Sequence, residues 1–160
     1  MINCEFENGN KANLRHVTVG CIVAKDNKIL LAKRSQKLML EGGKWCLPGG
    51  FMEHGETASE ACEREVLEES GWKIKNLKLF RINDNPNRPH EDRQNIDFIY
   101  IAEADKGVGE KDWESEEISW FPLDRLPAKN MIAFDHIDSI ELYKKYLKNP
   151  FHLPLTGLSK

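Results

Sequence analysis

The sequence predicts an α+β fold, an α/β/α sandwich in which a mixed β-sheet is flanked by helices, and three observations support this prediction. Short apolar runs rich in β-branched and aromatic residues alternate with turn residues, which is typical of strands. Residues 57–70 and 135–147 have the apolar spacing of helices. Two helices are too few for a regular array of parallel strands, because each parallel pair needs a crossover connection.

The composition is that of one globular domain, and we expect residues 1–160 to form a single domain. The chain has 160 residues, of which 40% are hydrophobic and 31% charged, and this allows an ordinary buried core. The formal net charge is −3, so no overall positive field draws the protein to nucleic acid or to an anionic membrane. We therefore expect no stable nucleic-acid partner, and local groups must hold any anionic substrate.

The cysteines and the apolar runs indicate a protein of the cytoplasm. The four cysteines, Cys4, Cys21, Cys46 and Cys62, form neither a C-x-x-C pair nor a zinc-like cluster, so we expect reduced, buried or half-buried thiols. No apolar run approaches the roughly 18 residues that a membrane-spanning helix needs. Residues 1–13 also lack the apolar core of a signal peptide. We expect a cytoplasmic protein with no membrane partner.

The first strands are expected before residue 48. Residues 17–24 and 29–32 are apolar and lie on either side of a turn at residues 26–27, so they predict a hairpin. Residues 45–47 predict a short extended segment, because the proline that follows disfavours helical geometry in the residue before it.

The helix at residues 57–70 has the clearest pattern of all the elements. Thr57 followed three residues later by Glu60 is a capping box, and Gly71 stands where a left-handed residue ends a helix. Later strands are predicted at residues 77–82, 96–102 and 117–121, and a second helix at residues 135–147.

Three carboxylates of the first helix, those of Glu65, Glu68 and Glu69, share one face within one turn. Small apolar residues one turn earlier lie on the same side, so this face also packs on the sheet. Like charges repel in a partly desolvated place, and the cluster therefore favours a bound cation. Oxygen ligands select a hard ion, Mg²⁺ or Mn²⁺, over zinc. An ordinary solvated acidic face is the alternative.

The segment that leads into this helix and runs along it resembles the Nudix box. Residues 47–51 read LPGGF and supply a glycine turn whose backbone can approach a ligand closely. Residues 50–72 read GFMEHGETASEACEREVLEESGW: a glycine, five residues, a glutamate, seven residues, Arg-Glu-Val, one residue, Glu-Glu, one residue and a glycine. The final apolar position is Trp72, which is larger than the usual aliphatic residue. The resemblance implies the Nudix fold and a hydrolase of phosphorus-containing anhydrides.

The resemblance implies that Glu65 and Glu69 are the main ligands of Mg²⁺, for which Mn²⁺ is a substitute. Glu68 would be a further ligand or a base, and the Gly49 carbonyl a backbone ligand. The implied reaction is attack of water on a phosphorus atom of a diphosphate. The metal neutralises the phosphates and lowers the pKa of the water.

Arg64 has a positioning role in this resemblance. It would point away from the metal and pair with Glu56, which fixes the loop before the helix and preorganises the ligands. Ion pairs of Arg64 with Glu60 or Glu68, four residues away on the same helix, are the alternative, and such pairs contribute little.

A general base is also needed, because the attacking water must lose a proton. In many relatives it comes from a loop or strand well after the box, and the stretch WESEE at residues 113–117 is the matching region. We favour Glu117 and then Glu116. A solvated acidic loop is the alternative.

The polar connection at residues 83–94 is the first candidate for substrate recognition, because loops of that length often have a function. Its arginines, Arg88 and Arg93, are expected to hold a phosphate or a terminal ribose phosphate. Arg34 is a comparable candidate, and Phe51 is a candidate for contact with a base. The loop resembles those of ADP-ribose pyrophosphatases, so we favour ADP-ribose or a related sugar nucleotide. A flexible loop without such a role is the alternative.

Other functions remain open at this stage. Hydrolysis of nucleoside triphosphates or dinucleotides is one alternative, and a catalytically silent nucleotide-binding regulator is another, although the intact glutamates speak against it. A third is an acidic helix that binds cations or a protein without turnover. The five histidines lack ligand spacing, so we expect them in packing or on the surface. The resemblance also leaves a homodimer open.

Overall fold

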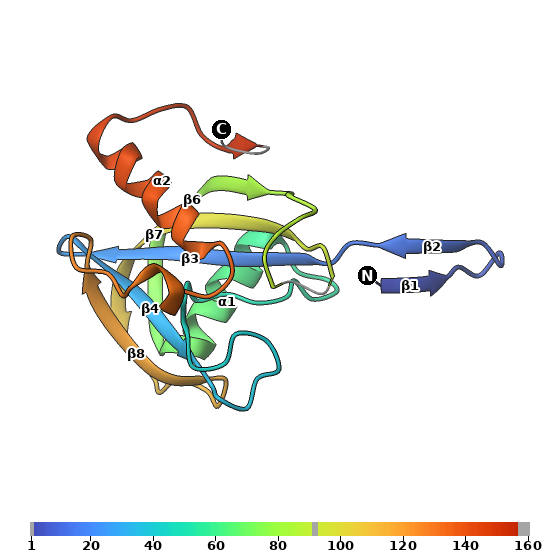
Figure 1. The fold of residues 1–160 in the computed structure, drawn as a ribbon, viewed down its shortest axis with the longest axis horizontal. Helices are drawn as coiled ribbons and strands as arrows, with labels where there is room; N and C mark the ends of the chain where they lie inside the picture. Colours follow the sequence, from blue (N-terminus) through green and yellow to red (C-terminus); the bar gives the residue numbers. More distant parts are fainter. Residues whose placement is uncertain (1, 91–92, 157–160) are drawn as a thin grey trace.

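The main sheet is mixed, and two of its central strands are parallel. The structure is a computed structural model that describes residues 2–90 and 93–156. The strands of this sheet are β3 (Val17–Lys25), β4 (Lys28–Arg34), β5 (Trp45–Cys46), β6 (Trp72–Asn83), β7 (Ile96–Gly107), β8 (Ser115–Pro122) and β9 (Leu155–Thr156). Their order is β5-β4-β3-β7-β6-β9, with β8 paired to β4. The paired strands are antiparallel except for β3 with β7 and β6 with β9 (Figure 1).

One face of the sheet is covered by α1 (Ala58–Ser70), which begins and ends as the sequence predicts. The Thr57 hydroxyl accepts a hydrogen bond from the Glu60 N–H, and the Glu60 carboxylate accepts one from the Thr57 N–H. Gly71 ends the helix with a φ of 70°, a left-handed conformation that glycine adopts without steric cost. The apolar side chains that α1 buries are Ala61, Cys62 and Val66.

The opposite face is covered by α2 (His136–Lys148), as Figure 1 shows. Ile140 and Tyr143 of α2 are buried in a cluster with Phe80 of β6. This cluster is separate from the one beneath α1. Each face of the sheet thus has its own apolar core, and the predicted α+β sandwich with a mixed sheet is confirmed.

Several elements depart from the sequence prediction. The hairpin of β1 (Ile2–Glu5) and β2 (Lys11–Leu14) was not predicted, and Figure 1 shows it projecting away from the sheet. The 3-10 helix η1 (Lys129–Met131) and β9 were not predicted either. Strand β6 begins at Trp72, five residues before the predicted start, because its pairing with β7 continues through register shifts that apolar alternation does not reveal.

The cysteines agree with the expectation of reduced thiols. All four cysteines are free thiols, three of them buried and Cys4 partly exposed. In the part of the chain that the structure describes, no helix is both long and apolar enough to cross a membrane.

Candidate active site

The acidic face of α1 becomes more buried toward the sheet. Glu69 is buried, with 6% of its surface exposed. The Glu65 side chain is 15% exposed, whereas that of Glu68 is 52% exposed. The three carboxylates of the predicted cluster therefore differ in exposure: that of Glu69 is buried, that of Glu65 is half-buried and that of Glu68 is exposed to solvent. An ordinary solvated helix face does not fit the position of Glu69.

The glycine turn lies directly against these carboxylates. The Gly49 N–H donates a hydrogen bond to Oε2 of Glu69 over 3.0 Å. A Cβ at Gly49 would lie 2.1 Å from the carbonyl oxygen of Val19, and a Cβ at Gly50 would lie 2.6 Å from the Glu65 carboxylate. Any side chain at either position would collide with the strand or with the acid, so both glycines are needed for the close approach of turn and helix.

Backbone hydrogen bonds attach this turn to β3. The Val19 N–H donates to the Gly50 carbonyl oxygen over 2.9 Å, and the Cys21 N–H donates to the Pro48 carbonyl oxygen over 2.9 Å. Because β3 is a central strand, the turn that faces Glu65 and Glu69 is held by the most rigid part of the sheet.

Arg64 makes the predicted ion pair and two others. Its Nη2 lies 2.7 Å from Oε1 of Glu56, and its Nε donates to Oε2 of the same carboxylate over 3.1 Å. It also donates to the Phe51 carbonyl oxygen over 3.0 Å, which ties the loop to the helix. However, Nη1 lies 2.8 Å from Glu65 and 3.1 Å from Glu68. Arg64 therefore contacts the acidic face, contrary to the expectation that it points away.

The electrostatics of the site show an excess of negative charge. Burial is the main cause that raises the pKa of Glu69, and the nearby Glu65 and Asp112 act in the same direction, whereas the Gly49 hydrogen bond and Arg34 oppose them; the result is a pKa of about 8. Burial also raises the pKa of Glu65. Over the described ranges, no three acidic, histidine or cysteine side chains converge into a closed metal cluster. Arg64 contacts the carboxylates of Glu65 and Glu68, and the Gly49 N–H contacts that of Glu69.

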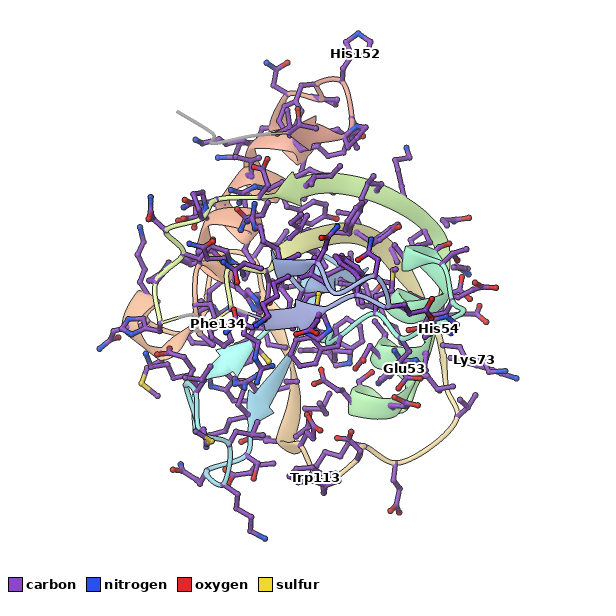
Figure 2. The ribbon with its side chains drawn as sticks, turned by 90° about the vertical axis from the view of Figure 1, so that its right-hand side faces the viewer. Glu53, His54, Lys73, Trp113, Phe134 and His152 are labelled. Atoms are coloured by element: carbon purple, nitrogen blue, oxygen red, sulfur yellow. The ribbon has the colours of Figure 1, made fainter. Side chains whose placement is uncertain are left out.

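These residues line a cavity of about 690 Å³. In Figure 2, Glu53 and Phe134, which both line it, lie on opposite sides of the view. The cavity is large enough for a ligand of nucleotide size, because small-molecule sites usually measure about 300–1,000 Å³. The predicted site residues that line it are Arg34, Gly49, Phe51, Arg64, Glu65, Glu68, Glu69, Arg88 and Arg93.

Two pairs of an arginine and a phenylalanine line the cavity. Phe51 stacks on His16 with ring centroids 4.1 Å apart, and the Arg93 guanidinium lies 5.2 Å from the Phe51 centroid. Arg34 lies 5.2 Å from the ring centroid of Phe134 and donates from Nε to a backbone carbonyl of the loop after β4. Phe51, Arg93 and Arg34 thus reach the cavity, as the sequence predicts.

Arg88 has a different environment from the one expected. Its side chain is 3% exposed and lies 2.8 Å from Asp135 and 3.3 Å from Asp97. The sequence predicts that this side chain holds a phosphate of the substrate, and in the structure it pairs with two acids. Asp97 comes from the start of β7, which follows the connection directly, whereas Asp135 precedes α2 and is 47 residues away in the sequence.

The acidic stretch at residues 113–117 lies partly in β8, and its acids differ in whether they line the cavity. Glu116 and Glu117 are exposed, and neither lines the cavity; Glu117 lies within β8 opposite Lys33. Asp112 and Glu114 line the cavity instead. The physical reason is that the loop before β8 docks on the end of α1, where the Asp112 N–H donates to the Glu68 carbonyl oxygen over 2.9 Å.

Two further cavity residues escaped the sequence analysis. His136, expected in packing or on the surface, is half-buried, and its Nδ1 accepts a hydrogen bond from the Leu47 N–H over 3.0 Å. Phe134 has a positive φ of 52°, unusual for a bulky residue. The sequence signal that could have found them is the motif FDH at residues 134–136, an aromatic and two polar groups at a helix start.

Comparison with known proteins supports one family. The NUDIX domain matches residues 14–143 of the chain. An ADP-ribose pyrophosphatase from Methanocaldococcus jannaschii is 36% identical over 130 residues, which cover 81% of this chain and 73% of that protein. The human 8-oxo-dGDP phosphatase NUDT18 is 28% identical over 90% of this chain, although the match spans only 44% of that longer protein.

A solved structure agrees along the whole length. The NUDIX hydrolase from Nitrosomonas europaea superposes with a TM-score of 0.76 and 26% identity, and the match covers 99% of this chain and 94% of that one. The box, the sandwich and the acidic cavity therefore have one common explanation. The chain belongs to the Nudix hydrolase family.

Proposed function

We propose that this protein is a Mg²⁺-dependent pyrophosphohydrolase that cleaves a nucleoside diphosphate linked to another group, with ADP-ribose as the favoured substrate. One observation carries the proposal: a buried glutamate, Glu69, and a half-buried one, Glu65, meet a glycine turn on the wall of a cavity of nucleotide size. Buried carboxylates without a matching cation are costly, so the site favours a cationic ligand.

The donor set fits a hard divalent ion. Glu65 and Glu69 would hold Mg²⁺ or Mn²⁺ with carboxylate oxygens, and the exposed Glu68 and the Gly49 carbonyl would complete the set. A pKa of about 8 means that the surroundings of Glu69 favour its neutral form, and a bound cation would favour the charged carboxylate instead. When bound, the ion would neutralise the phosphates and lower the pKa of the attacking water.

The protein's own groups position the reactants and move the proton. Water forms a bond to one phosphorus, the bridging P–O bond breaks, and the second phosphate leaves; ADP-ribose gives AMP and ribose 5-phosphate. We assign the general base to Glu114, with Asp112 as the second choice, because both line the cavity. Arg64 holds the loop at Phe51 and the carboxylates of Glu56 and Glu65 in one arrangement.

The cavity has two separate surfaces that could each contact one end of the substrate. Phe51 with Arg93 offers one surface for a ring and a phosphate, and Arg34 with Phe134 offers another. The similarity to an ADP-ribose pyrophosphatase along 81% of the chain also favours ADP-ribose. Nucleoside triphosphates and dinucleotides are the alternative substrates.

A turnover assay tests the proposal. The protein is incubated with Mg²⁺ and, separately, with ADP-ribose, a dinucleoside polyphosphate, NADH, a nucleoside triphosphate and capped RNA, and release of nucleoside monophosphate or pyrophosphate is measured. We expect the highest kcat/KM with ADP-ribose, recovery with Mn²⁺ and loss of activity with a chelator. Failure to hydrolyse any of these compounds would contradict the proposed function.

A silent nucleotide-binding protein is the competing reading. Calorimetry separates the two, because that reading predicts binding of ADP-ribose with no AMP released over hours. Gel filtration at several concentrations tests, in the same preparation, whether the protein forms the homodimer that the resemblance leaves open.

A further inference from the structure

A buried polar seam joins β6, β7 and the connection between them to the start of α2. We define it by six residues that are each at most 8% exposed: Arg81, Asn83, Arg88, Asp97, Asp135 and Ser139. Burying this many polar groups is unfavourable unless they satisfy one another. The pairing of these groups with one another is therefore expected to hold the surrounding elements together.

Arg88 lies at the centre of the seam. Its Nη2 and Nε donate to Oδ1 of Asp135 over 2.8 and 3.0 Å, and Nη2 lies 3.3 Å from Oδ2 of Asp97. Asn83 donates to the other oxygen of Asp135 over 2.7 Å. One side chain from the connection is thus held by acids of both β7 and α2.

The charges of the seam balance. Arg81 and Arg88 supply two positive charges, and Asp97 and Asp135 supply two negative charges. Arg88 is therefore neutralised inside the protein and offers little net charge to a phosphate, even though part of it borders the cavity. The other arginine of the connection, Arg93, lies over the Phe51 ring at the cavity wall.

The seam also reaches the glycine turn at residues 47–51. His136 follows Asp135 in the chain, and its Nδ1 accepts the hydrogen bond from the Leu47 N–H. Leu47 is two residues before Gly49, whose N–H contacts Glu69. The seam therefore connects the wall that carries Arg93 with the turn that contacts the carboxylates.

We propose that Arg88 is a positioning residue for substrate binding: its ion pair with Asp135 and Asp97 holds the β6–β7 connection so that Arg93 stays at the cavity wall. The kinetic part of this inference rests on the proposed function. Its structural part, that the ion pairs of Arg88 tether the β6–β7 connection, is independent of that function.

The experiment compares Arg88→Gln and Arg88→Lys with the exposed control Arg125→Gln, each in the wild-type and in an Arg93→Ala background. Arg88→Lys keeps the charge and guards against a Gln variant that fails to fold. We measure KM and kcat for ADP-ribose with Mg²⁺. In parallel, mass spectrometry follows tryptic cleavage after Arg93 in the proteins that retain this arginine, a readout that needs no activity.

We expect Arg88→Gln to raise KM about tenfold with kcat changed less than about twofold, and Arg88→Lys to have a smaller effect. In the Arg93→Ala background the rise in KM should shrink to less than about twofold, because Arg88 acts through Arg93. Cleavage after Arg93 should become faster in both Arg88 variants and stay unchanged in Arg125→Gln.

Three results would overturn the inference. Unchanged cleavage after Arg93 in both Arg88 variants would show that no tether was lost, whether or not the wild-type protein hydrolyses ADP-ribose. Faster cleavage with unchanged KM would reduce Arg88 to a stabilising residue. An equal rise in KM in both backgrounds would mean that Arg88 acts independently of Arg93. Absence of turnover by the wild-type protein would contradict the proposed function instead.

Discussion

The backbone N–H of Gly49 and the carboxylate of Glu69 are joined by a hydrogen bond of 3.0 Å. This bond connects a turn that is attached to a central strand with a helix that covers the sheet. A single neutral donor does not balance a buried negative charge, and the pKa of Glu69 is accordingly raised to about 8 by its burial. The relationship suggests that Glu69 is retained for a ligand rather than for stability.

Glu69→Gln should therefore lose activity without losing stability. The amide keeps the shape and can still accept the Gly49 N–H through its oxygen, but the ligand charge is gone. We expect kcat to fall about 100-fold or more, equivalent to about 2.7 kcal/mol of transition-state stabilisation, and Tm to stay the same or rise. Glu63→Gln, at an exposed position of the same helix, is the control. Full activity of Glu69→Gln would exclude Glu69 as a metal ligand.

The choice of general base gives a paired prediction. Glu114→Gln should lower kcat at neutral pH by about 100-fold, because Glu114 lines the cavity, whereas Glu117→Gln should keep full activity, because Glu117 is exposed within β8. Steady-state kinetics over a range of pH measure both. Loss of activity only in Glu117→Gln would restore the sequence-based assignment, and loss only in Asp112→Asn would transfer the role to Asp112.

The arrangement around Arg64 predicts that lysine cannot replace arginine. Lysine keeps the positive charge but lacks the planar fork that contacts Glu56, Glu65 and the Phe51 carbonyl together. We expect Arg64→Lys to lower kcat/KM about 10-fold, as is typical when a group that orients metal ligands is lost. In the double variant Arg64→Lys with Glu56→Gln, the fall in kcat/KM should be smaller than the product of the falls in the two single variants. Full activity of Arg64→Lys would show that charge alone suffices.

The sequence predicts the parts of this molecule whose cause is local. The capping box at Thr57, the glycine after α1 and the acidic face follow from spacing along one helix, and all three are present. Apolar alternation also places β3, β4 and β7 correctly. Their register against one another is a tertiary property, and it explains why β6 starts earlier than predicted.

The parts that the sequence misses depend on contacts between distant segments. Arg88 is buried because Asp97 and Asp135 meet around it, and no spacing rule joins positions 47 residues apart. Asp112 and Glu114 reach the cavity because a loop bonds to the end of α1, whereas composition alone made Glu117 look equivalent. Local patterns thus predict the helix that carries the chemistry but not the groups that complete the cavity.

The half-buried imidazole of His136 predicts a pH dependence of stability. Burial is the main cause that lowers the pKa of His136, Arg88 acts in the same direction and Asp135 opposes them, and the result is a pKa of about 3. Its ordinary value in the unfolded chain is about 6.5. Between these values the unfolded state binds a proton that the folded state does not, so this group destabilises the fold progressively as the pH falls below about 6.5.

Comparison with His136→Asn isolates this effect from other groups, including Glu69, whose raised pKa acts with the opposite sign. The Asn oxygen can replace Nδ1 as the acceptor for the Leu47 N–H but does not titrate. Between pH 7 and pH 5, the free energy of unfolding of the wild-type protein should fall by about 2 kcal/mol relative to His136→Asn. Urea titrations at both pH values measure this difference. Equal pH dependence of wild type and His136→Asn would mean that folding leaves the pKa of His136 unchanged.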